Sequence, residues 1–143
     1  VVGEVRGKEA FDMLQAMNTG HDGSLTTLHA NGTNDALNRL ETMVLMSGLD
    51  IPIRAVREYM ESAIDLVICI ERLSDGKRKI VDVSEVNGMS NDVIKLDKIF
   101  EFNQIGLLDT GEVNGEFKQV TRKPKIIRKL RIRGIKNLDN LFD

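Results

Sequence analysis

The stretch "DLVICI", residues 65–70, gives the strongest indication of fold class in the sequence. It is a nearly continuous apolar run of strand length, bounded by a carboxylate on each side. Such a run is typical of a strand covered on both faces, as in a parallel sheet. Upstream, residues 1–5 ("VVGEV") have the character of the end of another strand. Residues 24–30 ("SLTTLHA") are Thr-rich and short enough for a third.

Three helices are expected between these strands. Residues 8–18 place Ala10, Phe11, Leu14 and Met17 at helical spacing, and Gly20 lies where a C-cap would stand. A second helix is expected from Thr33, which can cap it, to Gly48. A third begins at Pro52. The order strand, helix, strand, two helices, strand is the alternation of an α/β domain with parallel strands.

The pattern changes near Glu71. "SDGK" is a tight-turn signal, and "KRKIVDVSEV" and "VIKLDKIFEF" alternate apolar and polar residues as half-exposed antiparallel strands do. "DTGEVNGEFKQV" adds a further hairpin-like unit, and a helix is expected over residues 124–133. The sequence therefore predicts two parts: α/β in residues 1–71, and a small antiparallel β unit with a terminal helix in residues 72–143.

The composition suits a soluble globular chain with an aliphatic core. Hydrophobic residues make up 41% and aromatic residues 4% of the 143 residues, and the formal net charge is -2. No apolar run approaches the ~18 residues of a membrane span, and no signal peptide is recognisable. The single cysteine, Cys69, has no internal disulfide partner, which fits a reducing compartment. Because the chain opens on "VV" without a preceding turn, we expect further residues before Val1.

One segment departs from this overall charge. Residues 122–136 contain eight Lys or Arg residues, a density that could bind nucleic acid or anionic lipid. The alternative, which the sequence favours, is a solvated helix with Ile126, Ile127 and Leu130 packed inward. No aromatic residue is interleaved there for base stacking.

Three residues of different chemistry are expected at neighbouring strand ends. Glu4 and Arg6 follow the first strand, and His29 lies near the end of the next. Ligands of open α/β sheets bind beyond the carboxyl ends of strands, so this set is a candidate phosphate site. The carboxylate could orient or deprotonate a water, and the imidazole could donate to a terminal phosphate. Each residue also has an ordinary interpretation, as a solvated loop glutamate or a structural histidine. The two histidines match no usual zinc spacing.

The stretch "VVGEVRGKEAFDMLQAMNTGHDGSLTTLHANGTNDALNRLETMV", together with "RKPKIIRKLRIRGI", resembles the secretion-superfamily ATPases. These are the hexameric motors of type II and type IV secretion and of type IV pilus systems, and the CpaF-type branch that drives Tad pili is most similar. The resemblance implies that "VVGEVRG" is an atypical Walker B region, with Gly3 in place of the usual aspartate. Glu4 would be the catalytic carboxylate, polarising the attacking water and helping to hold Mg²⁺ through its water shell.

The resemblance also assigns "TGHDGSLTTLHAN" to the His box of the family. Both imidazoles would lie near the γ-phosphate and the adjoining subunit, with His29 as the phosphate sensor and His21 ordering the loop. Arg6 and Arg39 match family positions and would act in nucleotide sensing or between subunits. Arg39 could equally be an exposed helix residue.

The implied protein is a hexameric motor that hydrolyses ATP with Mg²⁺ to power secretion or pilus assembly. It would be cytoplasmic and peripheral at the inner face of the cell membrane, with inner-membrane platform proteins as partners and no specific nucleic acid. Its fold would be the C-terminal half of a RecA-like P-loop NTPase core, with Walker B and His box in residues 1–71. The phosphate loop G-x-x-x-x-G-K-[ST] is missing from the sequence, so the isolated chain is expected to be inactive. The alternative function is a non-catalytic oligomerisation or interaction module that docks to the secretion platform.

Overall fold

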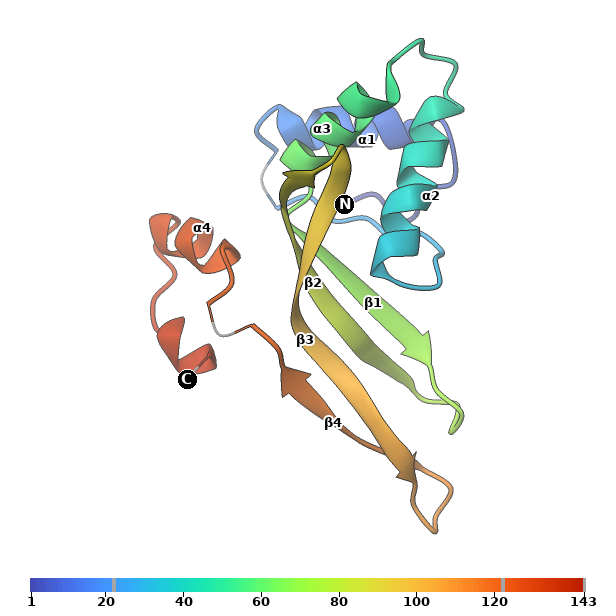
Figure 1. Cartoon of the computed structure of the whole chain (residues 1–143), viewed down its shortest axis with the longest axis vertical. Coiled ribbons are helices and arrows are strands. Elements are labelled where there is room, and N and C mark those ends of the chain that lie inside the picture. Colours follow the sequence, from blue (N-terminus) through green and yellow to red (C-terminus); the bar gives the residue numbers. More distant parts are fainter. Residues whose placement is uncertain (22, 122, 143) are drawn as a thin grey trace. The chain divides into compact units, whose positions relative to one another are not determined.

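A computed structural model describes residues 1–21, 23–121 and 123–142 of the chain. It contains four α-helices, four strands and a short 3₁₀ helix among these residues, labelled in Figure 1. In chain order they are α1 Glu9–Asn18, α2 Thr33–Leu45, α3 Ile53–Ala63, β1 Leu66–Arg72, β2 Arg78–Ser90, β3 Val93–Leu107, β4 Val113–Gln119, α4 Ile126–Ile132 and η1 Asp139–Leu141.

The chain forms two compact units that are not continuous in sequence. Unit 1 consists of Val1–Asp65 and Val86–Lys95, and unit 2 of Leu66–Glu85 and Leu96–Asp143. The long strands β2 and β3 contribute residues to both units, because their shared turn at Asn91 and Asp92 belongs to unit 1.

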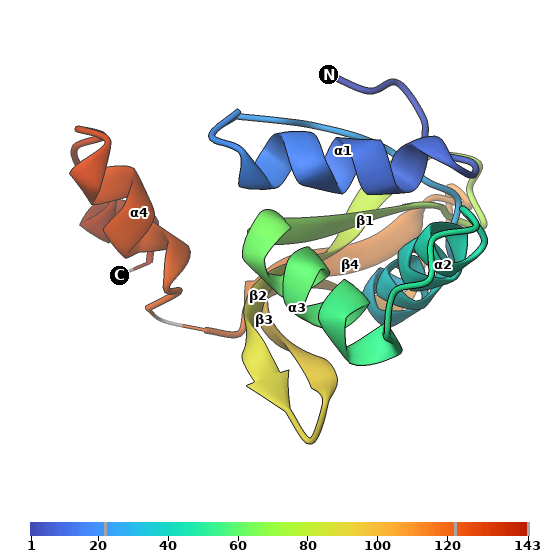
Figure 2. The same cartoon turned by 90° about the horizontal axis from the view of Figure 1, so that it is seen from above.

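Unit 1 is built on three helices that contact one another pairwise (Figure 2). The helical spacing expected from the sequence is confirmed in α1, α2 and α3. The ring of Phe11 in α1 stacks on that of Tyr59 in α3, with centroids 5.7 Å apart. The most fully buried apolar side chains are Val5, Ala10, Leu14, Leu40, Val44, Val56 and Met60.

The start of α2 differs from the expectation that Thr33 caps it. Thr33 is the first residue inside the helix, and the N-cap is Gly32, whose φ of 155° favours glycine. No side chain caps the first turn directly. Instead, the carboxylate of Asp35 reaches back and accepts a hydrogen bond of 2.8 Å from the backbone N–H of Asn31. The entry to α2 is therefore held by Asp35, from within the helix.

The predicted parallel strands are not present in the described residues as a sheet. Residues 24–30 do not form a strand; their pairing with the first residues is an isolated parallel bridge between Val2 and Thr26. Two backbone hydrogen bonds of 2.9 Å accompany it, from Val2 N to Leu25 O and from Val5 N to Thr27 O. The two segments thus lie side by side, but the ladder is too short to be a regular strand pair.

The prediction that "DLVICI" is a doubly covered parallel strand is wrong. These residues enter β1, which pairs antiparallel with β2, and Ile68 and Ile70 are 53% and 62% exposed. An apolar run specifies neither strand direction nor the layer that covers it. The direction is instead set by the tight turn after β1, where Leu73 N bonds to Lys77 O at 2.9 Å.

Unit 2 contains most of a four-stranded sheet in the order β1-β2-β3-β4. Its two hairpin turns have the same construction: Gly76 and Gly111 adopt φ of 80° and 81° and donate to the carbonyls of Leu73 and Leu108. The turns are tied together by Asp75, whose carboxylate accepts from the backbone N–H of Val113 at 2.9 Å. The turn and alternating strands predicted for this region are confirmed.

The C-terminal helix packs within unit 2. The predicted helix over residues 124–133 is observed as α4, with Ile127 buried. Further along the chain, the ring of Phe142 stacks on Phe100, which also stacks on Phe117. The carboxylate of Glu85, 3% exposed, accepts hydrogen bonds of 2.9 and 3.0 Å from the backbone N–H groups of Lys125 and Ile126. This buried carboxylate fixes the start of α4 against β2.

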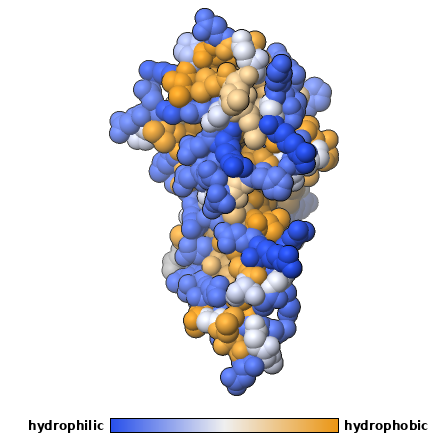
Figure 3. All heavy atoms as spheres, turned by 90° about the vertical axis from the view of Figure 1, so that its right-hand side faces the viewer, coloured by the Kyte–Doolittle hydropathy of each residue, from blue (hydrophilic) through white to orange (hydrophobic). Residues whose placement is uncertain are grey.

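The surface of the molecule carries many apolar side chains. Figure 3 shows them, in orange, among polar ones over both the helices and the hairpins. No helix in the described part of the chain combines the length and apolar character needed to cross a membrane.

Candidate functional site

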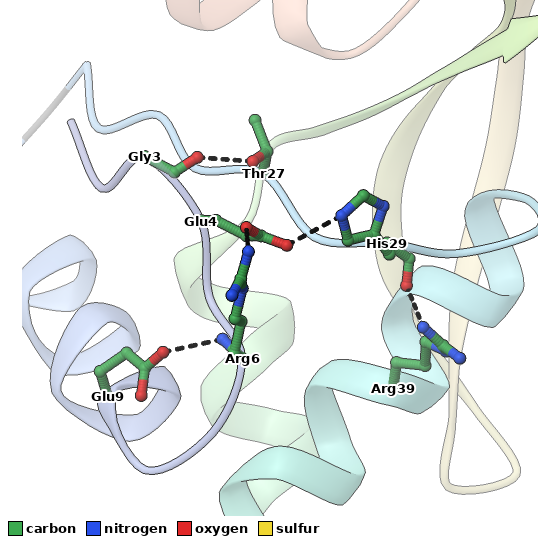
Figure 4. A network of polar contacts seen from close by, with 7 residues as sticks. All are labelled: Gly3, Glu4, Arg6, Glu9, Thr27, His29 and Arg39. Carbon is green, nitrogen blue, oxygen red and sulfur yellow. Dashed lines mark hydrogen bonds and ion pairs between the residues drawn. The ribbon is translucent and has the colours of Figure 1, made fainter.

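The candidate site is centred on the carboxylate of Glu4, in unit 1. Arg6 donates from Nη2 to Glu4 Oε2 at 2.6 Å, and His29 Nε2 lies 3.0 Å from Glu4 Oε1 (Figure 4). Both oxygens of the carboxylate therefore have a partner. The three residues that strand-end reasoning placed together are together in the structure.

Backbone pairing brings Glu4 and His29 to each other. The bridge at Val2 and Thr26 aligns the two segments, and the Thr27 hydroxyl donates to the carbonyl of Gly3 at 2.6 Å (Figure 4). Val5, 1% exposed, fixes the first segment by inserting its side chain into the core. Because neighbouring residues of an extended segment point to opposite sides, burial of Val5 turns Glu4 outward.

Arg6 is held in place by the first residue of α1. The carboxylate Oε1 of Glu9 accepts a hydrogen bond of 2.7 Å from the backbone N–H of Arg6. Bonds from backbone N–H groups, that of Arg6 foremost, lower the pKa of the Glu9 carboxyl below its usual value. The hydrogen bond to Glu9 thus fixes the connection between the Glu4 segment and α1.

His29 is held from the other side by α2. The Nη1 atom of Arg39 donates to the backbone carbonyl of His29 at 2.5 Å (Figure 4). Asp35 Oδ2 lies 3.8 Å from Arg39 Nε and accepts from the N–H of Asn31. We call Asp35 and Arg39 the α2 clamp. The clamp binds the carbonyl of His29 and the N–H of Asn31 to one turn of α2.

The electrostatics of the cluster favour an ionised carboxylate. The hydrogen bond from Arg6 is the largest influence and lowers the pKa of Glu4, and the charges of Arg6 and His29 act in the same direction. Glu4 in turn raises the pKa of Arg6. The side chains of Arg6 and His29 are 77% and 87% exposed, and that of Glu4 is 24% exposed. The carboxylate is therefore shielded by two groups that solvent, or a solute anion, can reach.

His21 makes its contacts away from this cluster. Its Nδ1 lies 3.1 Å from the carbonyl of Ala16, at the end of α1, and its own carbonyl accepts from the Ser24 hydroxyl at 2.7 Å. The structure therefore brings together Glu4, Arg6, His29 and Arg39, whereas His21 serves the turn that follows α1. No group of three or more His, Cys, Asp or Glu side chains in the described residues is arranged to hold a metal ion.

Sequence reasoning missed three residues that build the site: Glu9, Thr27 and Asp35. All three act on backbone groups. The spacing of Asp35 and Arg39, four residues apart on a helix, is the one signal that could have drawn attention to the clamp.

Comparison with known proteins supplies the family. The sequence profile described as "Type II/IV secretion system protein" matches residues 1–115. The chain belongs to this family. Its membership confirms the resemblance to the secretion-system ATPases, whereas the Walker B and His-box assignments and the CpaF-type branch stay predictions.

Several curated family members are similar over part of this secretion-system chain. TrbB of Rhizobium radiobacter, a conjugal transfer protein, is 37% identical over 91 residues, 64% of this chain and 27% of that protein. PtlH of Bordetella pertussis, a type IV secretion system protein, is 37% identical over 93 residues, 62% and 27% of the two chains. A putative conjugal transfer protein of Mycobacterium tuberculosis is 36% identical over 84 residues, 59% and 23%. The chain spans about a quarter of the length of these relatives.

One solved structure of the family is similar in fold. The VirB11 ATPase of the Brucella suis type IV secretion system, crystallised with sulphate, aligns with a TM-score of 0.55 and 31% identity. The alignment covers 58% of this chain and 26% of that one. The helices and antiparallel sheet of the secretion-system chain thus form an α/β arrangement similar to VirB11. A parallel RecA-like core is not part of what the described residues contain.

Proposed function

We propose that this chain is the water-activating part of an ATPase that powers a secretion system or pilus. The observation that carries the proposal is the Glu4 carboxylate held between Arg6 and His29. A relative of similar fold is an ATPase, and the family is that of secretion-system proteins. In this cluster a carboxylate with a lowered pKa is in contact with two exposed side chains of types that donate to phosphate, Arg6 and His29.

Each residue of the cluster has a distinct role in the proposal. Glu4, a carboxylate whose pKa Arg6 lowers further, accepts a hydrogen bond from the attacking water and orients it. Arg6 and His29, both exposed, donate to phosphate oxygens as charge develops on them. The α2 clamp joins the backbone of His29 to α2, so that a change at His29 on nucleotide binding is transmitted to this helix.

Mg²⁺ fits this site only as an ion that is also held by ligands other than the described residues. The described residues offer no cluster of three or more protein ligands, so Glu4 would contact the ion through its water shell. When bound, Mg²⁺ supplies neutralisation of phosphate charge. What the chain itself provides is the Glu4 carboxylate and, in contact with its two oxygens, the donors Arg6 and His29.

The phosphate cradle belongs, in this proposal, to other residues of a longer protein. The sequence has no G-x-x-x-x-G-K-[ST] loop, and the relatives are about four times as long as the part they share with it. The complete motor is then a hexamer at the cytoplasmic face of the inner membrane, contacting platform proteins, with His21 ordering its loop near the adjoining subunit. The CpaF-type branch, and hence Tad pili, is the finer assignment that the sequence suggests.

A second candidate function is a non-catalytic oligomerisation or interaction module that docks to the platform. The missing phosphate loop favours it for the 143 residues taken alone. Under both proposals the isolated chain turns over no ATP. They differ in the complete protein, where only the first makes turnover depend on the Glu4 cluster.

The test of the catalytic proposal is the substitution His29→Ala in the complete protein. His29 is 87% exposed and contributes little to packing, so we expect the unfolding temperature to be almost unchanged. Turnover should fall by about tenfold or more, the loss expected when one donor to a developing charge is removed. Thermal unfolding and steady-state hydrolysis are measured on the same preparation.

The matched control for His29 is His21→Ala, which removes the other imidazole of the chain. Since the contacts of His21 lie at the end of α1, we expect a smaller loss of turnover. A lower unfolding temperature with unchanged activity per folded molecule in His29→Ala would assign His29 a structural role and contradict the proposal.

A further inference from the structure

The charges of the chain are distributed very unevenly. All 22 acidic residues lie outside residues 117–138, while eight of the 20 basic residues lie between Arg122 and Lys136. Since the formal net charge of the whole chain is only -2, a strongly basic C-terminal segment is joined to an acidic remainder. A charge asymmetry of this kind is characteristic of a segment that binds a polyanionic surface.

The structure places part of this charge on one face of α4. Ile127 is buried, Lys125, Lys129 and Ile132 lie on the opposite side of the helix, and Arg128 lies beside them at spacings of three and four. All four are exposed. The outward face therefore consists of three cations around one aliphatic side chain.

The aliphatic character continues beyond the helix end. Ile132 is 76% exposed, Ile135 48% and Leu141 63%. The position of Ile135 is fixed by a helix-ending motif: Gly134, with φ of 84°, donates to Arg131 O, and Ile135 N donates to Leu130 O at 3.1 Å. We call Lys125, Arg128, Lys129, Ile132 and Ile135 the α4 surface.

The α4 surface is mounted on a fixed support within unit 2. Glu85 binds the first two N–H groups of the helix region, and the Thr121 hydroxyl donates to Lys98 O at 2.7 Å just before it. After the helix, the ring of Phe142 stacks on Phe100 of β3, which also stacks on Phe117 of β4. A backbone held in this way loses little conformational freedom when the surface binds.

Lipid suits this surface better than nucleic acid. Single-stranded nucleic acid is bound by cations interleaved with aromatic rings, and the aromatic residue of the C-terminal segment, Phe142, is engaged with Phe100. Exposed isoleucines beside cations contribute nothing to phosphate binding, but they can enter the boundary between headgroups and acyl chains. Cations around them then lie at the level of anionic headgroups.

We propose that the α4 surface binds the membrane directly, with Lys125, Arg128 and Lys129 on anionic lipid headgroups and Ile132 and Ile135 inserted among them. This goes beyond the proposed ATPase function, because it assigns a membrane-contacting surface to residues that take no part in nucleotide chemistry. It gives a motor at a membrane a contact of its own with the lipid.

The experiment is sedimentation of the 143-residue chain with phosphatidylcholine vesicles containing or lacking phosphatidylglycerol. We expect binding only to the anionic vesicles, weakening as salt is added. The double variant Arg128→Gln/Lys129→Gln should lower the partition coefficient about 10- to 30-fold. Ile132→Ser should lower it severalfold without changing the charge.

The matched control removes two exposed lysines elsewhere, in Lys8→Gln/Lys118→Gln, and should bind nearly as the unchanged chain does. Circular dichroism establishes that each variant is folded. Equal binding to neutral vesicles, an equal loss in the control, or binding to a DNA duplex with no vesicle binding would overturn the proposal. Since no nucleotide is present, the result is independent of whether the chain belongs to an active ATPase.

Discussion

At the scale of single residues, the site depends on the partners of one carboxylate. Glu4 has Arg6 on one oxygen and His29 on the other, and Arg6 is the larger cause of its lowered pKa. Removing the guanidinium removes both the hydrogen bond and the charge. The pKa of Glu4 is therefore the quantity that reports on the cluster in solution.

We predict that Arg6→Gln raises the pKa of Glu4 toward its ordinary value. Because the folded pKa is depressed, ionised Glu4 stabilises the folded chain above the unfolded pKa, and this contribution is lost as pH falls through the folded pKa. In Arg6→Gln the loss begins at a higher pH. Carbon-13 NMR titration of the Glu4 carboxyl measures the shift.

The control is Arg54→Gln, which removes an exposed guanidinium that pairs with Glu58 and Asp92 in the same unit. It should leave the Glu4 titration unchanged. An unchanged Glu4 titration in Arg6→Gln itself would contradict the account of the cluster.

The sequence was sufficient to find the titratable members of this cluster but not their supports. Glu4, Arg6 and His29 could be predicted because charged residues after strand-like segments collect at one edge. Thr27, Glu9 and the Asp35 side of the α2 clamp could not, because their partners are backbone groups of Gly3, Arg6 and Asn31. The positions of backbone groups follow from the folded path of the chain, which side-chain patterns do not specify.

At the scale of elements, the tightest packing recorded for a glycine is between β3 and β4. Gly115 of β4 lies opposite Gln104, next to an irregularity in the pairing. A Cβ atom built at Gly115 would lie 2.5 Å from Phe102 Cζ and 2.7 Å from the carbonyl oxygen of Asn103. The backbone oxygen cannot move without disturbing the ladder.

We predict that Gly115→Ala lowers the free energy of unfolding by about 1–3 kcal/mol, the cost typical of inserting a methyl group into filled space. Urea unfolding followed by circular dichroism measures the change. The control is Gly106→Ala on β3, where no heavy atom lies within 4 Å of the added Cβ. If the two variants unfold alike, the close approach of Phe102 and Gly115 is not a feature of the folded chain.

Helices were easier to predict from this sequence than strand partners. The spacing of apolar residues located α1, α2, α3 and α4 because each helix satisfies its own backbone hydrogen bonds. The strand β1 was located, but its direction and exposure were not. An apolar run such as residues 66–70 of β1 has no local property that distinguishes a parallel neighbour from an antiparallel one, and the turn at Leu73 decides.

At the scale of the whole molecule, two surfaces of different purpose are proposed for one chain. The Glu4 cluster lies in unit 1, and the α4 surface lies in unit 2. The division into a partial P-loop NTPase core at residues 1–71 and an antiparallel β unit with a basic helix at 72–143 stays a prediction. Because the chain spans about a quarter of the length of these relatives, the proposed activity is assigned to a complete protein and not to these 143 residues alone.

The measurement that tests the central claim most directly is made on that complete protein, with Glu4→Gln as the variant. Glutamine keeps the size of the side chain and removes the negative charge that orients water. The account predicts nearly unchanged ATP affinity and turnover lower by about 10²- to 10⁴-fold. The control Glu58→Gln, an exposed carboxylate on α3, should keep full turnover. Near-normal turnover in Glu4→Gln, with ATP bound as in the unchanged protein, would contradict the assignment of Glu4 as the catalytic carboxylate.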